Sequence, residues 1–255
     1  MTSSTPERWF VCARPEPQPR LRLFCFPYAG GGPSIFRAWP EGLPAGVEVW
    51  AARFPGRGAR LKEVPFTRIG PLVEALAAAL EPYLNRPFAF FGHSLGALVG
   101  FELARELRRR DRPLPAHLFV SGCGAPHIPY PHPPIHALPD PAFLEELRRL
   151  EGTPAEVLAH RELMQLLLPA LRADFALRET YTCAPEPPLD LPITAFGGME
   201  DQRVNGERLE AWREQTTKAF TLHMLPGDHF FLNTARSLIL QMLGRELGPY
   251  LERVA

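Results

Sequence analysis

The segment around Ser94 has the residue types of a nucleophile held in a sharp turn. An apolar run over residues 88–91 leads directly into Gly92-His93-Ser94-Leu95-Gly96, and a helical pattern begins at Leu95. The pattern G-x-S-x-G between a strand and a helix is typical of a nucleophile elbow, where glycines avoid collisions with neighbouring backbone. It places the serine hydroxyl at the amino end of a helix, where backbone N–H groups favour developing negative charge. Because so short a pattern also arises by chance, Ser94 needs catalytic partners elsewhere in the chain.

Candidates for the acid and the base follow Ser94 in the chain order that such an elbow requires. The strand expected over residues 193–196 leads into a turn with Asp201, and the strand expected over 220–225 leads into a turn with His229. We expect His229 to accept the Ser94 proton and to return it to the leaving group. Asp201 would hold the imidazole in the required tautomer and stabilise its charged form.

Neighbouring titratable residues leave alternatives open. Glu200 is adjacent to Asp201 and competes with it for the role of the acid, whereas Asp228 is next to His229 in the sequence and is expected to point away from the ring. We expect His93 to pack beside the nucleophile, because the base has to come from a distant loop. Metal binding is disfavoured for the histidines of a proline-rich stretch, which are His127, His132 and His136.

The same chemistry needs two backbone N–H donors for an oxyanion. Leu95, the residue after the nucleophile, supplies the first. The strand expected over residues 21–26 is followed by Pro27-Tyr28-Ala29-Gly30-Gly31-Gly32, whose glycines allow the loop to approach the site closely. We assign the second donor to Ala29, with Tyr28 as the neighbouring alternative and a plain glycine-rich turn as the other interpretation. A phosphate-binding loop is disfavoured, because its Lys-Ser/Thr pair and a full G-x-G-x-x-G are missing.

Short apolar runs alternate with helical patterns along most of the chain. This alternation is typical of an α/β fold, in which helices cover both faces of a mostly parallel sheet. The expected strands are residues 21–26, 47–53, 88–91, 117–121, 193–196 and 220–225. The expected flanking helices are residues 69–84, 95–110 and 234–251. We expect one domain over residues 1–255.

Residues 126–188 interrupt this rhythm. Residues 126–139 contain six prolines, which fit neither a central strand nor a helix interior. The helical patterns that follow predict an insertion that lies as a lid over the carboxyl ends of the strands. Within the insertion, residues 163–168 would place apolar side chains on almost every side of a helix, so we expect this helix to be buried. We expect Pro169 to kink or end it.

The composition argues against several other classes of protein. The 28 basic and 28 acidic residues cancel, so no overall field attracts nucleic acid or an anionic membrane. No stretch reaches the roughly 20 apolar residues of a membrane span, and the first residues lack a signal-peptide pattern, so we expect a cytoplasmic protein. We also expect a monomer without a metal. The cysteines lack C-x-x-C spacing and are expected to be buried free thiols: Cys12, Cys25, Cys123 and Cys183.

Taken together, these motifs resemble the stand-alone type II thioesterases of polyketide synthase and nonribosomal peptide synthetase pathways. The similarity extends nearly end to end. It covers L-F-C-F-P-Y-A-G-G-G from Leu23, F-P-G-R-G-A-R-L from Phe54, F-F-G-H-S-L-G-A from Phe90, A-F-G-G-M-E-D from Ala195 and L-P-G-D-H-F-F-L from Leu225.

The resemblance implies an α/β-hydrolase fold with a helical lid and a small acyl chamber. It also implies hydrolysis of acyl groups, usually aberrant or stalled intermediates, from the phosphopantetheine arm of acyl or peptidyl carrier proteins, with no cofactor of the enzyme's own. Residue by residue, the nucleophile falls on Ser94, the acid on Asp201, the base on His229 and the oxyanion donors on Ala29 and Leu95.

Two departures from the family pattern stand close to the site. Gly122-Cys123-Gly124 occupies a place where a bulkier or basic residue is expected, and Asp228 replaces a usual glycine. Two other functions stay open. A general carboxylesterase or lipase would use the same triad, and a non-catalytic α/β-hydrolase could bind a ligand on the same fold.

Arginines crowd the far end of the helix that begins after Ser94. Their charge suits the negative end of a helix dipole, so we expect mostly a solvated cap. Docking of an acidic carrier is the alternative, although this end lies about 24 Å from Ser94 at roughly 1.5 Å per residue. The arginines are Arg105, Arg108, Arg109, Arg110 and Arg112.

Overall fold

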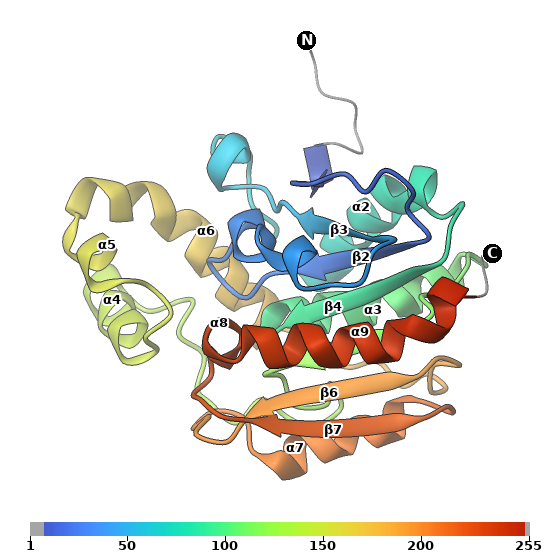
Figure 1. Cartoon of the computed structure of the whole chain (residues 1–255). Helices are drawn as coiled ribbons and strands as arrows, with labels where there is room; N and C mark the ends of the chain where they lie inside the picture. Colours follow the sequence, from blue (N-terminus) through green and yellow to red (C-terminus); the bar gives the residue numbers. More distant parts are fainter. Residues whose placement is uncertain (1–7, 253–255) are drawn as a thin grey trace.

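The computed structural model describes residues 8–252, and its centre is a twisted sheet with helices on both faces (Figure 1). The order of its strands is β1-β3-β2-β4-β5-β6-β7. β1 is antiparallel to β3, and the other neighbours pair in parallel. The strands are β1 Phe10–Val11, β2 Leu21–Phe26, β3 Val47–Ala52, β4 Phe88–His93, β5 Leu118–Ser121, β6 Ile193–Gly198 and β7 Phe220–Leu225. All six expected strands are present, and the short β1 was not expected.

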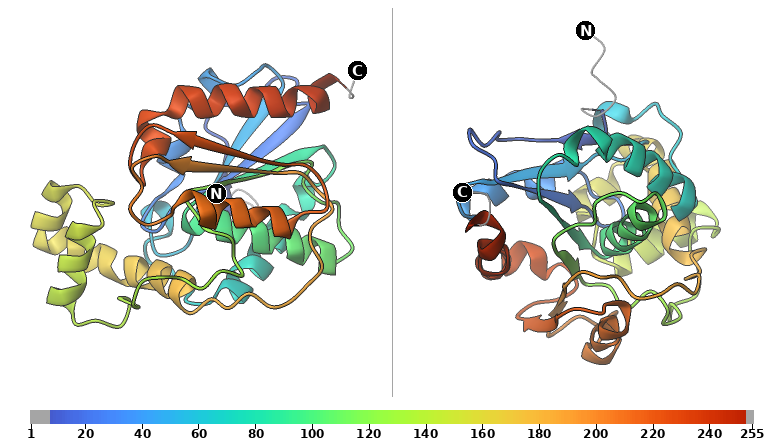
Figure 2. Two further views of the ribbon diagram at one scale, coloured as in Figure 1. Left: turned by 90° about the horizontal axis from the view of Figure 1, so that it is seen from below. Right: turned by 90° about the vertical axis from the view of Figure 1, so that its right-hand side faces the viewer.

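Both faces of the sheet are buried, because alternate residues of each strand enter different cores. Along β2, Phe24 and Phe26 contact the core under α2 and α3, whereas Leu23 and Cys25 contact the core under α9. Burying one such large apolar side chain stabilises the fold by about 1.5–3 kcal/mol. The two layers of helices lie on opposite sides of the sheet (Figure 2). The helices are α2 Ile69–Leu80, α3 Leu95–Arg109, α4 Asp140–Arg149, α5 Ala155–Ala159, α6 Arg161–Glu179, α7 Gly206–Glu210, α8 Phe231–Thr234 and α9 Arg236–Glu252.

The insertion between β5 and β6 consists of α4, α5 and α6, within the expected residues 126–188. Figure 1 shows α4 and α5 beside the main body, with α6 leading back toward the sheet. A small apolar core holds these three helices together: Phe143, Leu147, Leu158, Met164 and Leu171.

The expectation that residues 163–168 are buried was wrong. Leu163 is 36% exposed and Leu166 is 56% exposed, whereas Met164 is buried. The first half of α6 packs on the small core of the insertion through Met164, and its Leu163 and Leu166 side faces solvent. The helix also continues through Pro169 rather than ending there, and its second half is the buried part.

The four cysteines are free thiols, as expected, but only Cys25 and Cys123 are buried. Cys12 and Cys183 are partly exposed. Over residues 8–252, no helix has the length and apolar character needed to cross a bilayer.

Candidate active site

Ser94 lies in the turn between β4 and α3 with an unusual backbone conformation. Its φ of 52° and ψ of −115° fall in a region that residues with a side chain rarely adopt. The Ser94 N–H donates to the carbonyl oxygen of Ser121 at 2.7 Å, which anchors the turn to the end of β5. The strained turn is the expected nucleophile elbow.

Two glycines make this turn possible. A Cβ at Gly92 would lie 2.1 Å from the carbonyl oxygen of Gly96, and a Cβ at Gly96 would lie 2.0 Å from that of Phe26. Neither position tolerates a side chain without backbone movement. The second contact also brings the start of α3 against the end of β2, which leads into the glycine-rich loop of the expected oxyanion hole.

The structure brings the three expected catalytic side chains into one chain of hydrogen bonds. His229 Nε2 lies 3.1 Å from Ser94 Oγ, and His229 Nδ1 lies 2.8 Å from Asp201 Oδ2. Asp201 follows β6 and His229 follows β7, and the register of these strands pairs Gly198 with Leu225, so the two turns are adjacent. With the Nδ1 proton donated to Asp201, Nε2 is free to accept the Ser94 proton.

Asp201 is held as a carboxylate by its surroundings. Its Oδ1 accepts N–H bonds from Arg203 at 2.8 Å and Val204 at 3.2 Å. Burial acts to raise the pKa of Asp201, but the hydrogen bond and charge of His229 and the two backbone N–H groups outweigh it, so the pKa lies below the usual value. The competing acids lie elsewhere: the Glu200 side chain is exposed, and Asp228 accepts the Phe230 N–H at 2.7 Å.

His93 packs beside the elbow, as expected, and also holds the loop of the base. It is fully buried, with Nδ1 2.8 Å from Ser121 Oγ and Nε2 2.9 Å from the carbonyl oxygen of His229. Burial is the main cause of a pKa far below the usual value for the His93 imidazole, so the ring is neutral. A carbonyl only accepts, so Nε2 donates to His229 and Nδ1 accepts from the Ser121 hydroxyl.

The two expected oxyanion donors border the same pocket as Ser94. Ala29 and Leu95 both line it, and no hydrogen bond within residues 8–252 uses the N–H of either. Tyr28, the alternative donor, turns its ring toward Phe230 and His93, with centroid distances of 5.1 Å and 5.9 Å.

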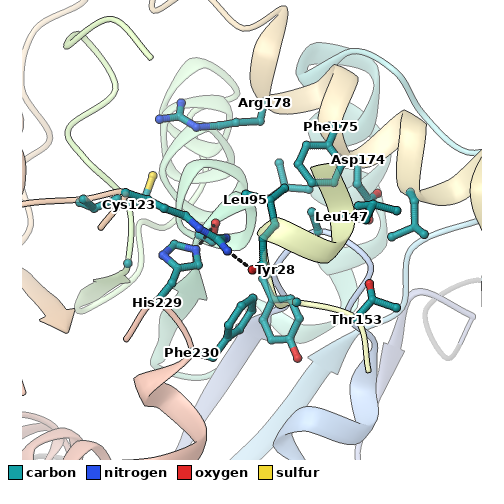
Figure 3. Close-up of a pocket in the computed structure, with 18 of the residues that line it drawn as sticks. Tyr28, Leu95, Cys123, Leu147, Thr153, Asp174, Phe175, Arg178, His229 and Phe230 are labelled. Atoms are coloured by element: carbon teal, nitrogen blue, oxygen red, sulfur yellow. Dashed lines mark hydrogen bonds between the residues drawn. The ribbon is translucent and has the colours of Figure 1, made fainter. Parts of the chain in front are cut away.

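The pocket beside Ser94 has a volume of about 790 Å³, which includes the space at its open mouth. Leu147, Leu171 and Phe175 line it from the insertion, and Leu95 and Phe230 line it from the main body (Figure 3). The wall contributed by α6 therefore comes from its second half rather than from residues 163–168. No group of three or more His, Cys, Asp or Glu side chains in the described part of the chain could hold a metal.

Arg203 and Gly122 belong to the site but were not expected in these roles. Arg203, two residues after the acid, donates to the carbonyl oxygen of Leu150 in the insertion and lies over the Phe230 ring at 5.4 Å. A Cβ at Gly122, whose φ is +57°, would lie 2.7 Å from the His93 ring. The departure at Gly122-Cys123-Gly124 thus makes room for the neutral histidine. No local sequence signal marks either contact.

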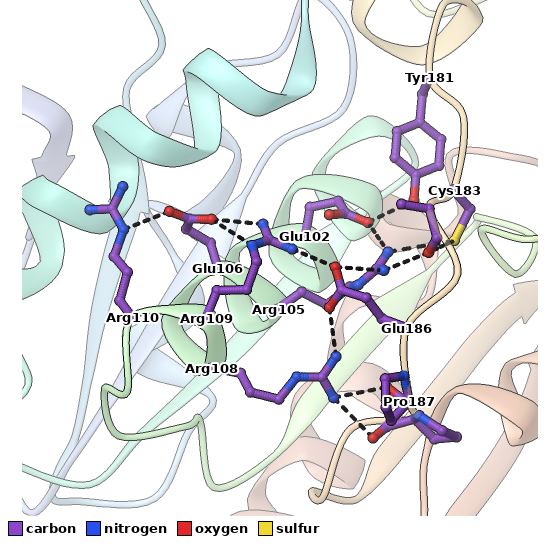
Figure 4. A network of polar contacts seen from close by, with 12 residues as sticks. Glu102, Arg105, Glu106, Arg108, Arg109, Arg110, Tyr181, Cys183, Glu186 and Pro187 are labelled. Atoms are coloured by element: carbon purple, nitrogen blue, oxygen red, sulfur yellow. Dashed lines mark hydrogen bonds and ion pairs between the residues drawn. The ribbon is translucent and has the colours of Figure 1, made fainter.

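Four of the five arginines at the end of α3 are partly or well exposed, as expected of a solvated cap, but Arg105 is buried and all five are paired with carboxylates. Arg105 is 2% exposed and pairs with Glu102 at 2.7 Å and with Glu186 at 2.9 Å (Figure 4). Glu186 lies on the segment from α6 to β6, which returns across the helix end, and it also pairs with Arg108 and Arg109. Arg110 pairs with Glu106, and Arg112 pairs with Glu81. This face therefore offers little uncompensated positive charge to an acidic carrier.

The chain belongs to the Thioesterase domain family, whose family model matches residues 21–247. It is 48% identical over 240 residues to the gramicidin S biosynthesis protein GrsT of Aneurinibacillus migulanus, with 94% of each chain covered. Its fold is similar to the RedJ thioesterase from the prodiginine pathway of Streptomyces coelicolor, with a TM-score of 0.84, 46% identity and 93% and 91% of the two chains covered. It is also similar to BorB, a type II thioesterase from the borrelidin cluster, with a TM-score of 0.86, 35% identity and 97% and 99% covered. The predicted fold, family and class of enzyme are confirmed.

Proposed function

We propose that this thioesterase releases acyl groups from the phosphopantetheine arm of carrier domains, with Ser94 as nucleophile, His229 as base and Asp201 as the acid that orients it. The observation that carries this proposal is the continuous chain of hydrogen bonds from Asp201 through His229 to Ser94, next to the N–H groups of Ala29 and Leu95. The names of similar proteins place them in gramicidin S, prodiginine and borrelidin biosynthesis.

The proposed reaction has two steps. Ser94 Oγ attacks the thioester carbonyl while His229 Nε2 accepts its proton, and the Ala29 and Leu95 N–H groups stabilise the oxyanion. The intermediate expels the phosphopantetheine thiolate, which takes the proton from His229, and an acyl-serine is left. Water then attacks this ester with His229 again as base, releasing the carboxylic acid and restoring Ser94.

The leaving group explains why a thioester suits this site. A thioester carbonyl is less stabilised by resonance than that of an amide or an oxygen ester, and a thiolate leaves with little help from an acid. The chamber adds an apolar surface for the acyl chain, formed by side chains such as Leu147 and Phe175. The proposed partners are therefore acyl or peptidyl carrier domains of a modular synthase, and the reaction requires no cofactor.

A hydrolysis panel tests this choice of substrate. Carrier proteins loaded with acetyl, propionyl, malonyl and hexanoyl groups would be compared with p-nitrophenyl esters of the same acids, with Ser94→Ala as the blank. We expect kcat/KM for at least one carrier-bound group to exceed that for the matching ester. Equal or lower values for every carrier would favour a general esterase. Absence of turnover on every substrate, together with failure of a fluorophosphonate to label Ser94, would favour a ligand-binding protein.

A further inference from the structure

One buried ion pair joins the insertion to the main body beside the active site. Asp174 of α6 is 1% exposed, and Arg57, in the loop after β3, is 8% exposed. Arg57 Nη1 donates to Asp174 Oδ2 at 2.7 Å and Nη2 donates to Oδ1 at 2.6 Å. This is the two-pronged geometry of a strong arginine–carboxylate pair. Arg57 belongs to the motif F-P-G-R-G, which has no part in the proposed reaction steps.

Both members of the pair also bind the backbone of the glycine-rich loop. The Gly30 N–H donates to Asp174 Oδ2 at 2.7 Å, and Arg57 Nη1 donates to the carbonyl oxygen of Gly31 at 2.9 Å. Helix α6 also packs directly on this loop, because a Cβ at Gly30 would lie 2.7 Å from Leu171 Cδ2. Figure 3 shows Asp174 on the insertion side of the pocket.

These bonds fix the conformation of the turn that carries the proposed oxyanion donor. The Gly31 N–H donates to the Tyr28 carbonyl oxygen at 2.9 Å, and Gly30 has a φ of +78°. Such a bond, with a positive φ at the third residue, is typical of a type II turn with Ala29 and Gly30 at its centre. The peptide between these two residues is the one that flips between type I and type II turns. Asp174 accepts the Gly30 N–H of this peptide and thereby holds the turn in one conformation, and the Ala29 N–H belongs to the peptide directly before it.

Stability alone is a poor explanation for this arrangement. A buried ion pair is often no more stabilising than apolar side chains of the same size. Arg57 Nε also has no hydrogen-bond partner, alone among buried side-chain nitrogen and oxygen atoms of residues 8–252. An unsatisfied buried donor is destabilising. The pair is thus better suited to holding the loop than to strengthening the core.

We propose that Asp174 and Arg57 are positioning residues that orient the Ala29 N–H toward the oxyanion, so that the hole is complete only when α6 is seated on the loop. The inference rests on the proposed function, since it concerns the oxyanion formed after attack by Ser94. The insertion then does more than cover the acyl chamber. It sets the geometry of one half of the oxyanion hole.

A conservative variant with a matched control tests the role of Asp174. Asp174→Asn keeps the shape of the side chain but replaces one of the two carboxylate oxygens by an NH₂ group. That group cannot accept from the Gly30 N–H or from the Arg57 guanidinium. Because removal of one oxyanion donor costs about 10²–10³ in kcat elsewhere, we expect kcat to fall at least about tenfold with KM changed less than about threefold. Glu102→Gln weakens another buried pair, with Arg105 at 2.7 Å, away from the pocket. It should lower the melting temperature but keep kcat within about threefold of the wild type.

A double variant separates positioning from stability. Arg57→Met/Asp174→Leu replaces both charges by apolar side chains, a change that leaves the stability of other proteins nearly unaltered or higher. We expect the melting temperature to recover relative to Asp174→Asn, while kcat stays at least about tenfold below that of the wild type. A double variant with a wild-type melting temperature and kcat within about threefold of the wild type would overturn the inference.

Labelling of Ser94 by a fluorophosphonate reads the same oxyanion hole without a carrier substrate. We expect the rate constant for labelling to fall at least about tenfold in Asp174→Asn and to change less than about threefold in Glu102→Gln. If wild-type Ser94 is labelled but carrier thioesters are not cleaved, the proposed substrate is wrong, and the labelling rates still decide the inference. Equal labelling rates in the wild type and Asp174→Asn overturn the inference alone, and a wild type that is not labelled overturns both.

Discussion

His93 Nε2 donates to the backbone carbonyl oxygen of His229 at 2.9 Å, so the residue before Ser94 holds the loop that carries His229. This contact joins the ends of β4 and β7, which are not neighbours in the sheet. The separation between Ser94 Oγ and His229 Nε2 therefore depends on a buried, neutral ring that takes no part in the proposed proton transfer.

We expect His93→Ala to lower kcat at least about tenfold, because a shift of about 1 Å in a catalytic group can cost about 10²-fold. The matched control is His117→Ala. His117 is also buried, bonds Thr194 Oγ1 at 2.9 Å and lies away from the pocket, so its loss should lower stability with kcat within about threefold of the wild type. Similar losses of kcat in both variants would refute the positioning role of His93.

Asp201→Asn should lower kcat about 10⁴-fold, because an amide can donate to His229 Nδ1 and hold the ring in the wrong tautomer. Glu200→Gln, one residue earlier, should leave kcat within about threefold, since its carboxylate is exposed. Steady-state kinetics on a carrier thioester measures both. If Glu200→Gln proved the more damaging change, the acid would have been assigned to the wrong residue.

Phe175→Trp should lower kcat/KM for a hexanoyl carrier about tenfold more than for an acetyl carrier, because only the longer chain meets the added bulk in the chamber. Leu166→Trp, on the exposed side of the same helix, should affect both carriers equally. Melting curves would establish that both variants are folded. Equal losses for the two chain lengths in Phe175→Trp would place the acyl chain elsewhere.

Glu186 should make stability depend on pH. Burial acts to raise the pKa of Glu186, but the hydrogen bonds from Arg108 and Arg105 outweigh it, so the pKa lies below its ordinary 4.5. Its stabilising effect is therefore fully present above pH 4.5 and is lost as pH falls through the lower pKa of the folded state.

At pH 7, Glu186→Gln should lower the melting temperature by about 2–4 °C, as expected for about 1 kcal/mol in a partly exposed network. It should also flatten the fall in melting temperature below pH 4.5. The control is Glu145→Gln at an exposed pair with Arg148, where we expect a change of less than about 1 °C. An unchanged acid slope in Glu186→Gln would mean that this network does not govern the pH dependence.

The parts of the fold that sequence reasoning predicted well are those with a local signal. Apolar runs predicted the six longer strands, and G-x-S-x-G between a strand and a helix predicted the elbow at Ser94. Glycines were informative because their positions allow no Cβ, as at Gly96 against Phe26. The structure also brings Asp201 and His229 to Ser94, which their chain order after late strands had predicted.

The remaining features depend on contacts between distant segments, which periodicity does not report. Arg57 and Asp174 are 117 residues apart, and Arg105 is buried where the segment of Ala184 and Glu186 returns across α3. The exposure of Leu166 follows from how little of the chain covers the first half of α6. The single-domain boundaries, the monomeric state and the cytoplasmic location stay predictions.

The central claim is that Ser94 forms an acyl-enzyme during cleavage of a carrier thioester. Its most direct test is rapid quenching of a single turnover, followed by digestion and mass spectrometry of the peptide that contains Ser94, with Ser94→Ala in parallel. We predict that the wild type carries the acyl group on Ser94, and that Ser94→Ala carries none and loses more than about 10³-fold in kcat while still binding the carrier. Retention of more than about a tenth of kcat by Ser94→Ala, or an acyl group on another residue, would contradict the account.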